Sequence, residues 1–190
     1  MVSFLYSLDV SLFRWINGGW SCLPLDAFFA FITDIHHYWI LIGLLLVYWL
    51  WKGGTEGRWL VLGLVVAVAL SDQTASHVIK GLAQRVRPCN VLEGVLTPIG
   101  KSGAFSFPSS HAANMGSSML LLSLAFKRWT PLFILVALLV GLSRIYLGLH
   151  YPSDVLGGYA LGALIGYGVW LGVGKLKTKF HRQDAKKNAE

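Results

Sequence analysis

Charged side chains are scarce in this chain. They make up 13% of its 190 residues, whereas 55% are hydrophobic. Soluble domains carry about 25% charged residues, so this composition excludes an ordinary soluble protein and indicates a membrane protein. The formal net charge of +7 does not indicate nucleic-acid binding, because the basic residues lie scattered between apolar runs and not on one polar face. We expect the lipid bilayer, and no nucleic acid, as a partner.

Cysteine is also rare. Cys22 and Cys89 are too few for a disulfide framework and too far apart for a zinc knuckle, so we expect no metal held by thiolates. The sequence contains no long repeat, low-complexity tract or flexible linker, which predicts a single domain over residues 1–190. No segment with signal-peptide features opens the chain, and we expect internal spans to drive membrane insertion.

Apolar stretches define the predicted fold class, an all-α integral membrane bundle. A crossing takes about 20 residues, and five stretches reach this length when their polar flanks are included. They are 38–51, 59–70 continuing toward Lys80, 112–126, 129–143 and 155–174. Within them, glycines at 158, 162 and 166, with 168 and 172, predict close helix packing in the last span. The transmembrane core therefore covers 38–174.

The first 35 residues follow a different pattern. Leu5, Leu8, Leu12 and Ile16 recur at helical spacing with polar residues between them, which is typical of a helix lying in the membrane interface. Residues 23–35 form either a second interfacial helix or a short sixth span.

Lysines and arginines set the predicted orientation, because loops rich in them stay in the cytoplasm. Ten of the sixteen lie on one side, including the tail over 175–190. We place this basic tail in the cytoplasm, where it would anchor the topology against anionic lipid. The other side holds Arg14, Lys80, Arg85, Arg87, Lys101 and Arg144.

Three polar clusters fall at the non-cytoplasmic ends of the predicted helices. In the first, Lys80 and Arg87 lie seven residues apart, about two turns, which predicts one helix face, with Pro88 ending the helix. The alternative is that these side chains only snorkel to the interface.

The second cluster is a predicted helix start. Pro108, Ser109 and Ser110 favour this position, so free N–H groups and the positive end of the helix dipole would form an anion site. His111 would stand in the first turn. A histidine here can equally be a capping or interfacial residue.

The third cluster joins two spans. Arg144 closes one span, Pro152 is expected to start the next, His150 lies just before it and Asp154 in its first turn. This spacing is common by chance, but a carboxylate beside a histidine also holds an imidazole nucleophile in one tautomer. Together the clusters supply two histidines, one acid and three permanent cations, which suits phosphoryl transfer.

These residues resemble the type-2 phosphatidic acid phosphatase superfamily, whose signature has three parts. Two parts are complete, Lys80 to Arg87 with Pro88, and Ser143, Arg144, His150 and Asp154. The middle part reads Pro108, Ser109, Ser110, His111, with serine where the family has glycine; this keeps the backbone N–H but would slow catalysis if the position needs a positive φ.

The resemblance implies a metal-independent phosphatase that works through a phosphohistidine and needs no cofactor. It makes His150 the nucleophile, Asp154 its orienting partner and His111 the general acid. The phosphate would be held by Lys80, Arg87, Arg144 and Ser109, with the N–H groups of Ser110 and His111.

Other polar residues receive structural interpretations. Asp72 is an acid within a span, and we expect it to pair with Ser76, His77 or Lys80. His36 and His37 adjoin an interface and are not expected to be catalytic.

Three functions remain to be compared. The leading hypothesis is a bacterial inner-membrane enzyme that removes phosphate from an envelope lipid at the periplasmic or extracellular face. The alternatives are a non-catalytic binder or transporter of a phospholipid anion, which would need the cations but not both histidines with Asp154, and a channel. Arg85 and Lys101 add cations beyond the signature, which favours undecaprenyl diphosphate first, with lipid A phosphate or phosphatidylglycerophosphate close behind. The sequence does not define the oligomeric state.

Overall fold

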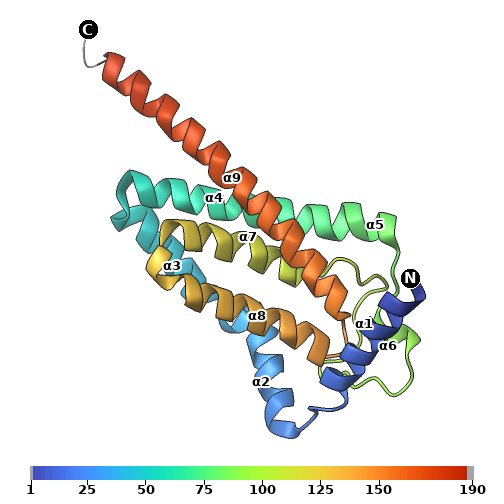
Figure 1. Cartoon of the computed structure of the whole chain (residues 1–190). Helices are drawn as coiled ribbons and strands as arrows, with labels where there is room; N and C mark the ends of the chain where they lie inside the picture. Colours follow the sequence, from blue (N-terminus) through green and yellow to red (C-terminus); the bar gives the residue numbers. More distant parts are fainter. Residues whose placement is uncertain (1, 188–190) are drawn as a thin grey trace.

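Helices form almost all of the ordered architecture (Figure 1). The structure, a computed structural model, describes the backbone of residues 2–187 and the side chains of residues 4–180, 182 and 183. The elements are α1 (Val2–Asn17), α2 (Leu23–Thr33), η1 (Ile35–His37), α3 (Trp39–Lys52), α4 (Gly54–Gln73), η2 (Thr74–Ile79), α5 (Lys80–Ala83), α6 (Pro88–Val91), α7 (Ser110–Ala125), η3 (Lys127–Trp129), α8 (Thr130–Tyr146) and α9 (Pro152–Lys187).

The all-helical prediction is confirmed for the described residues, where the only β pairing is an isolated bridge between Val86 and Phe105. Three continuous helical segments are long and apolar enough to cross a membrane, Gly54–Ala83, Lys127–Tyr146 and Pro152–Phe180. The helices α2 and α3 are apolar but shorter. The count of five crossings, and the division of the chain into interfacial, transmembrane and tail parts, stay predictions.

Helix α7 lies in the middle of the bundle and packs against α4, α8 and α9. Glycines bring α9 against it: a Cβ at Gly158 would lie 2.5 Å from the carbonyl oxygen of Ser109, and one at Gly166 2.8 Å from that of Ser117. Gly162 faces the α7 backbone in the same way. The predicted packing role is therefore confirmed for these three glycines, whereas a Cβ added at Gly168 or Gly172 would meet nothing of another helix within 4 Å.

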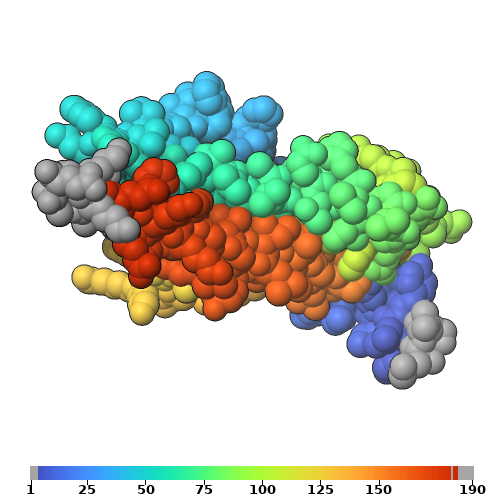
Figure 2. Space-filling view, turned by 90° about the horizontal axis from the view of Figure 1, so that it is seen from above, coloured from blue at the N-terminus to red at the C-terminus, as the bar shows by residue number. Residues whose placement is uncertain are grey.

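Helix α1 lies at one end of the bundle, near α6 and the start of α9 (Figure 1). The predicted stripe splits in two: Leu5, Leu8 and Leu12 are exposed, whereas Ile16 is buried. The buried side of the helix carries Asp9, Phe13 and Ile16, spaced at helical intervals. In the view of Figure 2, α4 and α9 lie side by side over the length of the bundle.

The prediction for Lys80 and Arg87 is wrong. Six residues before Lys80 form a π-helical turn, Thr74–Ile79, and α5 ends at Ala83 because Gln84 adopts a left-handed conformation with φ of 45°. Arg87 is extended, and Pro88 begins α6 instead of ending a helix. A turn, and not a shared helix face, sets the relative position of the two cations.

Candidate active site

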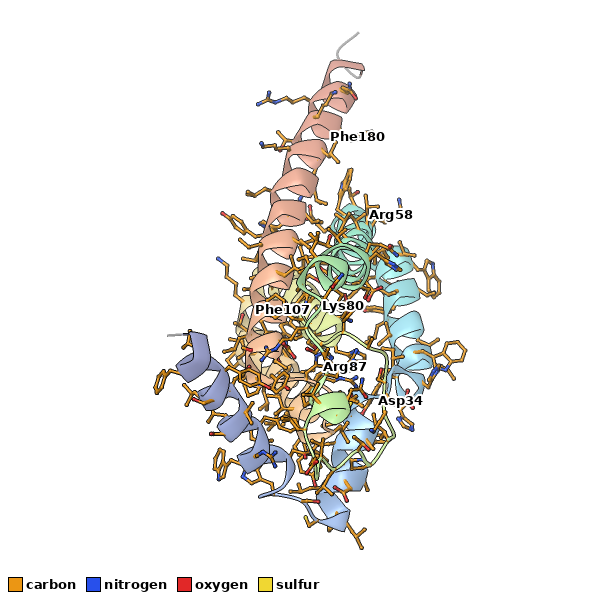
Figure 3. All side chains as sticks on the ribbon, turned by 90° about the vertical axis from the view of Figure 1, so that its right-hand side faces the viewer. Asp34, Arg58, Lys80, Arg87, Phe107 and Phe180 are labelled. Atoms are coloured by element: carbon orange, nitrogen blue, oxygen red, sulfur yellow. The ribbon has the colours of Figure 1, made fainter. Side chains whose placement is uncertain are left out.

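The three sequence clusters meet at one end of the bundle, as direct contacts between them show. Lys80 Nζ donates to Ser110 Oγ at 2.8 Å, which joins the first cluster to the second. Arg87 Nη1 lies 3.0 Å from His150 Nε2, which joins the first to the third. The backbone N–H of Ser109 donates to the carbonyl of Asp154 at 2.9 Å. Figure 3 shows Lys80 and Arg87 near each other, below Arg58 and Phe180 in that view.

His150 is 2% exposed and lies in the short connection between α8 and α9. Arg87 is a permanent donor, so the imidazole nitrogen that it contacts, Nε2, must be the acceptor. The proton of the neutral ring then resides on Nδ1, which lies 3.6 Å from Asp154 Oδ2. Burial lowers the pKa of His150 to about 4, although Asp154 opposes this shift. The ring is therefore neutral near pH 7, and its Nε2 lone pair accepts a hydrogen bond from Arg87.

Asp154 is fully buried and stands in the first turn of α9, as predicted. Its Oδ2 accepts a hydrogen bond from the N–H of Tyr151 at 2.8 Å, and its Oδ1 accepts one from Arg85 Nη1 at 2.7 Å. These two bonds fix the carboxylate beside His150. Pro152 begins α9, which confirms the predicted helix start.

The predicted helix start at Ser109 is also confirmed. Ser109 is the N-cap of α7, and its Oγ accepts the N–H of Ala112 at 3.4 Å. The N–H groups of Ser110 and His111 lie in the first turn, where a helix provides no carbonyl partner. Ser110 has an ordinary helical φ, since Gln84 is the one non-glycine residue with positive φ in the described backbone. Serine therefore causes no strain there, and its hydroxyl also bonds Ser76 Oγ at 2.9 Å.

Arg144 and His111 line one cavity of about 540 Å³. Arg144 is buried, and its Nη1 donates to Thr33 Oγ1 at 2.7 Å, so the end of α2 reaches the site. The remaining lining residues are Ala27, Ala30, Phe31, Thr33, Asp34, His37 and Ile99. His36 and His37, both interpreted from sequence as interfacial, are both exposed, and of the two only His37 is among the residues that line this cavity. The cavity thus joins polar donors to an apolar wall.

Asp72 has a polar partner, but a different one from those expected. Asn114 Nδ2 on α7 donates to Asp72 Oδ1 at 3.3 Å. Asn114 is 42 residues away in sequence, so the local spacing that suggested Ser76, His77 or Lys80 did not include it.

Arg85 corrects another expectation. It is not a spare cation for a substrate head group, because its guanidinium forms ion pairs with Asp154 and with Asp9, at 2.7 and 2.6 Å. Burial acts to lower the pKa of Arg85, but the two carboxylates more than offset it and raise the pKa. Lys101 stays exposed in the connection before α7. Sequence reasoning missed Asp9, although an isolated acid in a mostly apolar helix was the available signal.

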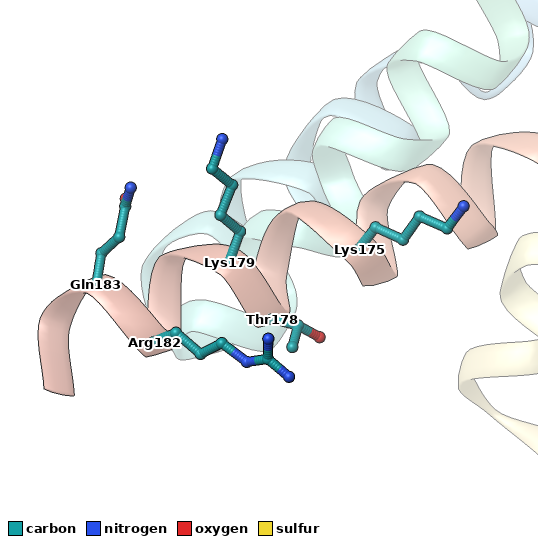
Figure 4. Close-up of a pocket in the computed structure, with 5 residues that line it drawn as sticks. All are labelled: Lys175, Thr178, Lys179, Arg182 and Gln183. Carbon is teal, nitrogen blue, oxygen red and sulfur yellow. The ribbon is translucent and has the colours of Figure 1, made fainter. Parts of the chain in front are cut away.

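A second hollow lies at the far end of α9 (Figure 4). Its volume is about 370 Å³, and every residue lining it comes from this one helix, Lys175, Thr178, Lys179, Arg182 and Gln183. Among the described side chains, the lining of this hollow includes no histidine or carboxylate to act on a bound anion. Among the residues that the structure describes, no three histidine, cysteine, aspartate or glutamate side chains cluster as metal ligands would.

The fold and the site define a class: a helical membrane protein with a histidine–carboxylate pair and buried cations at one end of the bundle. The family described as the PAP2 superfamily matches residues 58–177, which include all three clusters. The chain belongs to this superfamily, and the resemblance stated from the sequence is confirmed.

Named relatives cover most of the chain. A lipid A 4'-phosphatase of Bacteroides thetaiotaomicron is 34% identical over 186 residues, covering 90% of this chain and 78% of that protein. An undecaprenyl-diphosphatase of Sulfolobus acidocaldarius is 29% identical over 163 residues, covering 84% and 75%. The crystal structure of a transmembrane PAP2-type phosphatidylglycerolphosphate phosphatase from Bacillus subtilis matches with a TM-score of 0.69 and 26% identity, covering 90% of this chain and 87% of that one.

Proposed function

We propose that this protein is a membrane lipid phosphatase in which His150 forms a phosphohistidine intermediate. The observation that carries the proposal is the state of His150: Nε2 faces the Arg87 guanidinium at 3.0 Å, while Nδ1 faces Asp154 at 3.6 Å. This arrangement directs a neutral nucleophile toward cations that would hold a phosphate. A protein that only binds a phosphate anion needs the cations but not this oriented pair.

The reaction would take place in two balanced steps. In the first, which starts from protonated His111, Nε2 attacks phosphorus, the bond from phosphorus to the lipid oxygen breaks, and the His111 imidazolium gives its proton to the leaving oxygen. In the second, His111 takes a proton from water, the resulting hydroxide attacks phosphorus, and the bond to Nε2 breaks, releasing inorganic phosphate. Arg87 and Arg144, together with Lys80 and the first N–H groups of α7, would balance the charge of the equatorial oxygens.

The cavity beside His111 suits a lipid substrate. Ala27, Ala30, Phe31 and Ile99 supply an apolar wall, and Arg144 stands at the polar end. A lipid phosphate bound there would place its charge on the cations and its apolar part against α2. This end of α2 would then help to select the substrate.

Lipid A phosphate is our first candidate substrate. The sequence argument for undecaprenyl diphosphate depended on two spare cations, and one of them, Arg85, is already paired with two carboxylates. The lipid A 4'-phosphatase relative aligns over 90% of this chain. Undecaprenyl diphosphate and phosphatidylglycerophosphate follow, because relatives named for these substrates also match.

A lipid panel tests the function. Purified protein in one detergent should release inorganic phosphate from at least one of the three lipids without added metal, resist EDTA, and be inhibited by vanadate. His150→Ala should abolish this release, while Lys179→Ala, which changes an exposed side chain on α9, should leave it unchanged. Full activity of His150→Ala, a requirement for magnesium, or lipid binding without turnover would each contradict the proposal.

Sidedness needs its own experiment. We propose that the site faces the periplasm or the exterior and that the C-terminal end of α9 faces the cytoplasm of a bacterial inner membrane, following the uneven division of lysines and arginines. In a variant lacking Cys22 and Cys89, a cysteine at position 101 should react with a membrane-impermeant thiol reagent in intact cells. A cysteine at position 127 should be protected. The reverse pattern would place the site in the cytoplasm.

A further inference from the structure

Helix α1 lies outside the stretch that matches the family, yet it contacts the segment that carries His150 and Asp154. The contact centres on Asp9, which is 7% exposed. Asp9 Oδ1 accepts the backbone N–H of Ser153 at 2.9 Å, and Oδ2 accepts the Ser153 hydroxyl at 2.5 Å. Oδ2 also accepts from Arg85 Nη2 at 2.6 Å. A buried carboxylate with three donors has a defined position.

Arg85 extends this contact to Asp154. Its Nη2 serves Asp9, while its Nη1 donates to Asp154 Oδ1 at 2.7 Å and to Ser153 Oγ at 2.6 Å. One planar guanidinium therefore bridges two carboxylates that are 145 positions apart in the chain. Because Arg85 is bonded to both Asp9 and Asp154, its guanidinium cannot move far toward one carboxylate without losing its bond to the other.

Aromatic side chains of α1 hold the other group that positions Asp154. The N–H of Tyr151 donates to Asp154 Oδ2 at 2.8 Å. The Tyr151 ring packs against Phe13 and Tyr6, with ring centres 5.7 and 6.1 Å away, and lies under the Arg85 guanidinium at 4.1 Å. Both oxygens of Asp154 are thus fixed by groups that α1 contacts.

We propose that Asp9 is a positioning residue that acts on His150 through Arg85, Ser153 and Asp154. The inference rests on the phosphatase function proposed above. Without Asp9, Arg85 would have Asp154 as its one carboxylate partner and would turn toward it in the two-bond geometry that guanidinium and carboxylate favour. This would compete with His150 for the carboxylate. If Asp9 only capped the start of α9, it would need its bonds to Ser153 but not the Arg85 guanidinium that it shares with Asp154.

The test is Asp9→Asn in the full-length chain, which keeps the shape and removes the charge. We expect kcat to fall roughly tenfold to hundredfold, the usual cost of removing an outer partner of a functional group, with KM unchanged because Asp9 does not touch the phosphate site. Asp26→Asn is the matched control. It removes a carboxylate on α2 that accepts the Tyr146 hydroxyl at 2.6 Å, and kcat should not change.

A double-mutant cycle separates positioning from folding. If Asp9 acts through Asp154, then Asp9→Asn in an Asp154→Asn background should cause no further loss of kcat. A full, independent loss in that background would overturn the proposal. Ser153→Ala removes a bond to Asp9 without changing charge, and should lower kcat in the same direction if Asp9→Asn proves too unstable to purify. If the wild type is active and Asp9→Asn is equally active, the inference about Asp9 is refuted but the proposed function is not. If the wild type itself is inactive, the proposed function is refuted.

Discussion

The two ends of the molecule are both rich in cations, but they use them differently. At the site end, Arg85, Arg87 and Arg144 are buried or half-buried and contact carboxylate, imidazole or hydroxyl groups at 2.6 to 3.0 Å. At the far end, Lys175, Lys179 and Arg182 are exposed along one helix (Figure 4). Among the described side chains there, Lys177 contacts Glu56 of α4. Charge count predicts orientation, but burial and pairing distinguish a reactive site from an anchor.

Substituting His111 at the site end, and Arg182 at the far end of α9, should give the largest difference in activity between the two ends. We expect His111→Ala to lower kcat by about 10² to 10⁴, since a general acid contributes about this much. Both protonation of the leaving oxygen and activation of water would be lost. Arg182→Ala at the far end should change kcat little. Steady-state kinetics, with detection of phosphohistidine after an alkaline quench that preserves the P–N bond, measures both effects, and an unimpaired His111→Ala variant would contradict the assigned role.

Titration of His150 gives a second test. Burial lowers its pKa to about 4, so the ring should stay neutral down to about pH 5 instead of gaining a proton near 6.5. The unfolded chain binds this proton more readily, so the contribution of His150 to stability is complete above pH 6.5 and is lost as the pH falls toward 4. Nitrogen-15 NMR of labelled histidine, with His150→Ala to assign the signal, should show this low value. A midpoint at 6.5 would mean that water reaches the ring.

The smallest expected effect concerns Ser110. Its hydroxyl accepts from Lys80 Nζ and bonds Ser76, so Ser110→Ala should loosen Lys80 and raise KM severalfold, the equivalent of about one hydrogen bond. Ser110→Gly restores the residue usual in the family signature and removes the same hydroxyl. Equal KM values for the two variants would show that the hydroxyl, and not the backbone, is responsible. No change in either would show that Lys80 is oriented by other groups.

Local sequence spacing predicted much of the site because its parts are local. Pro152 and Asp154 in the first turn of α9, and Ser109 capping α7, follow from residue preferences at helix starts. The prediction that Lys80 and Arg87 share one helix face was wrong. It assumed the regular periodicity of an α-helix, which gives no sign of the π turn or of the left-handed conformation of Gln84. By contrast, Asp9 and Ser153, which contact each other, are 144 residues apart in the sequence. Thr33 and Arg144, which also form a contact, are 111 residues apart. Patterns of residue spacing within a short stretch of sequence cannot predict contacts between residues so far apart.

The glycine contacts between α7 and α9 have a practical consequence for engineering. Gly158, Gly162 and Gly166 put one backbone against the other, leaving no side chain that can rotate to separate them. Helix α7 carries His111, and α9 carries Asp154. These two helices therefore form a rigid frame that a library of substitutions should leave alone. Randomising Ala27, Ala30 and Phe31 would vary the cavity wall while preserving the spacing of His111 and Asp154, so a search for altered specificity under the proposed function should begin on α2.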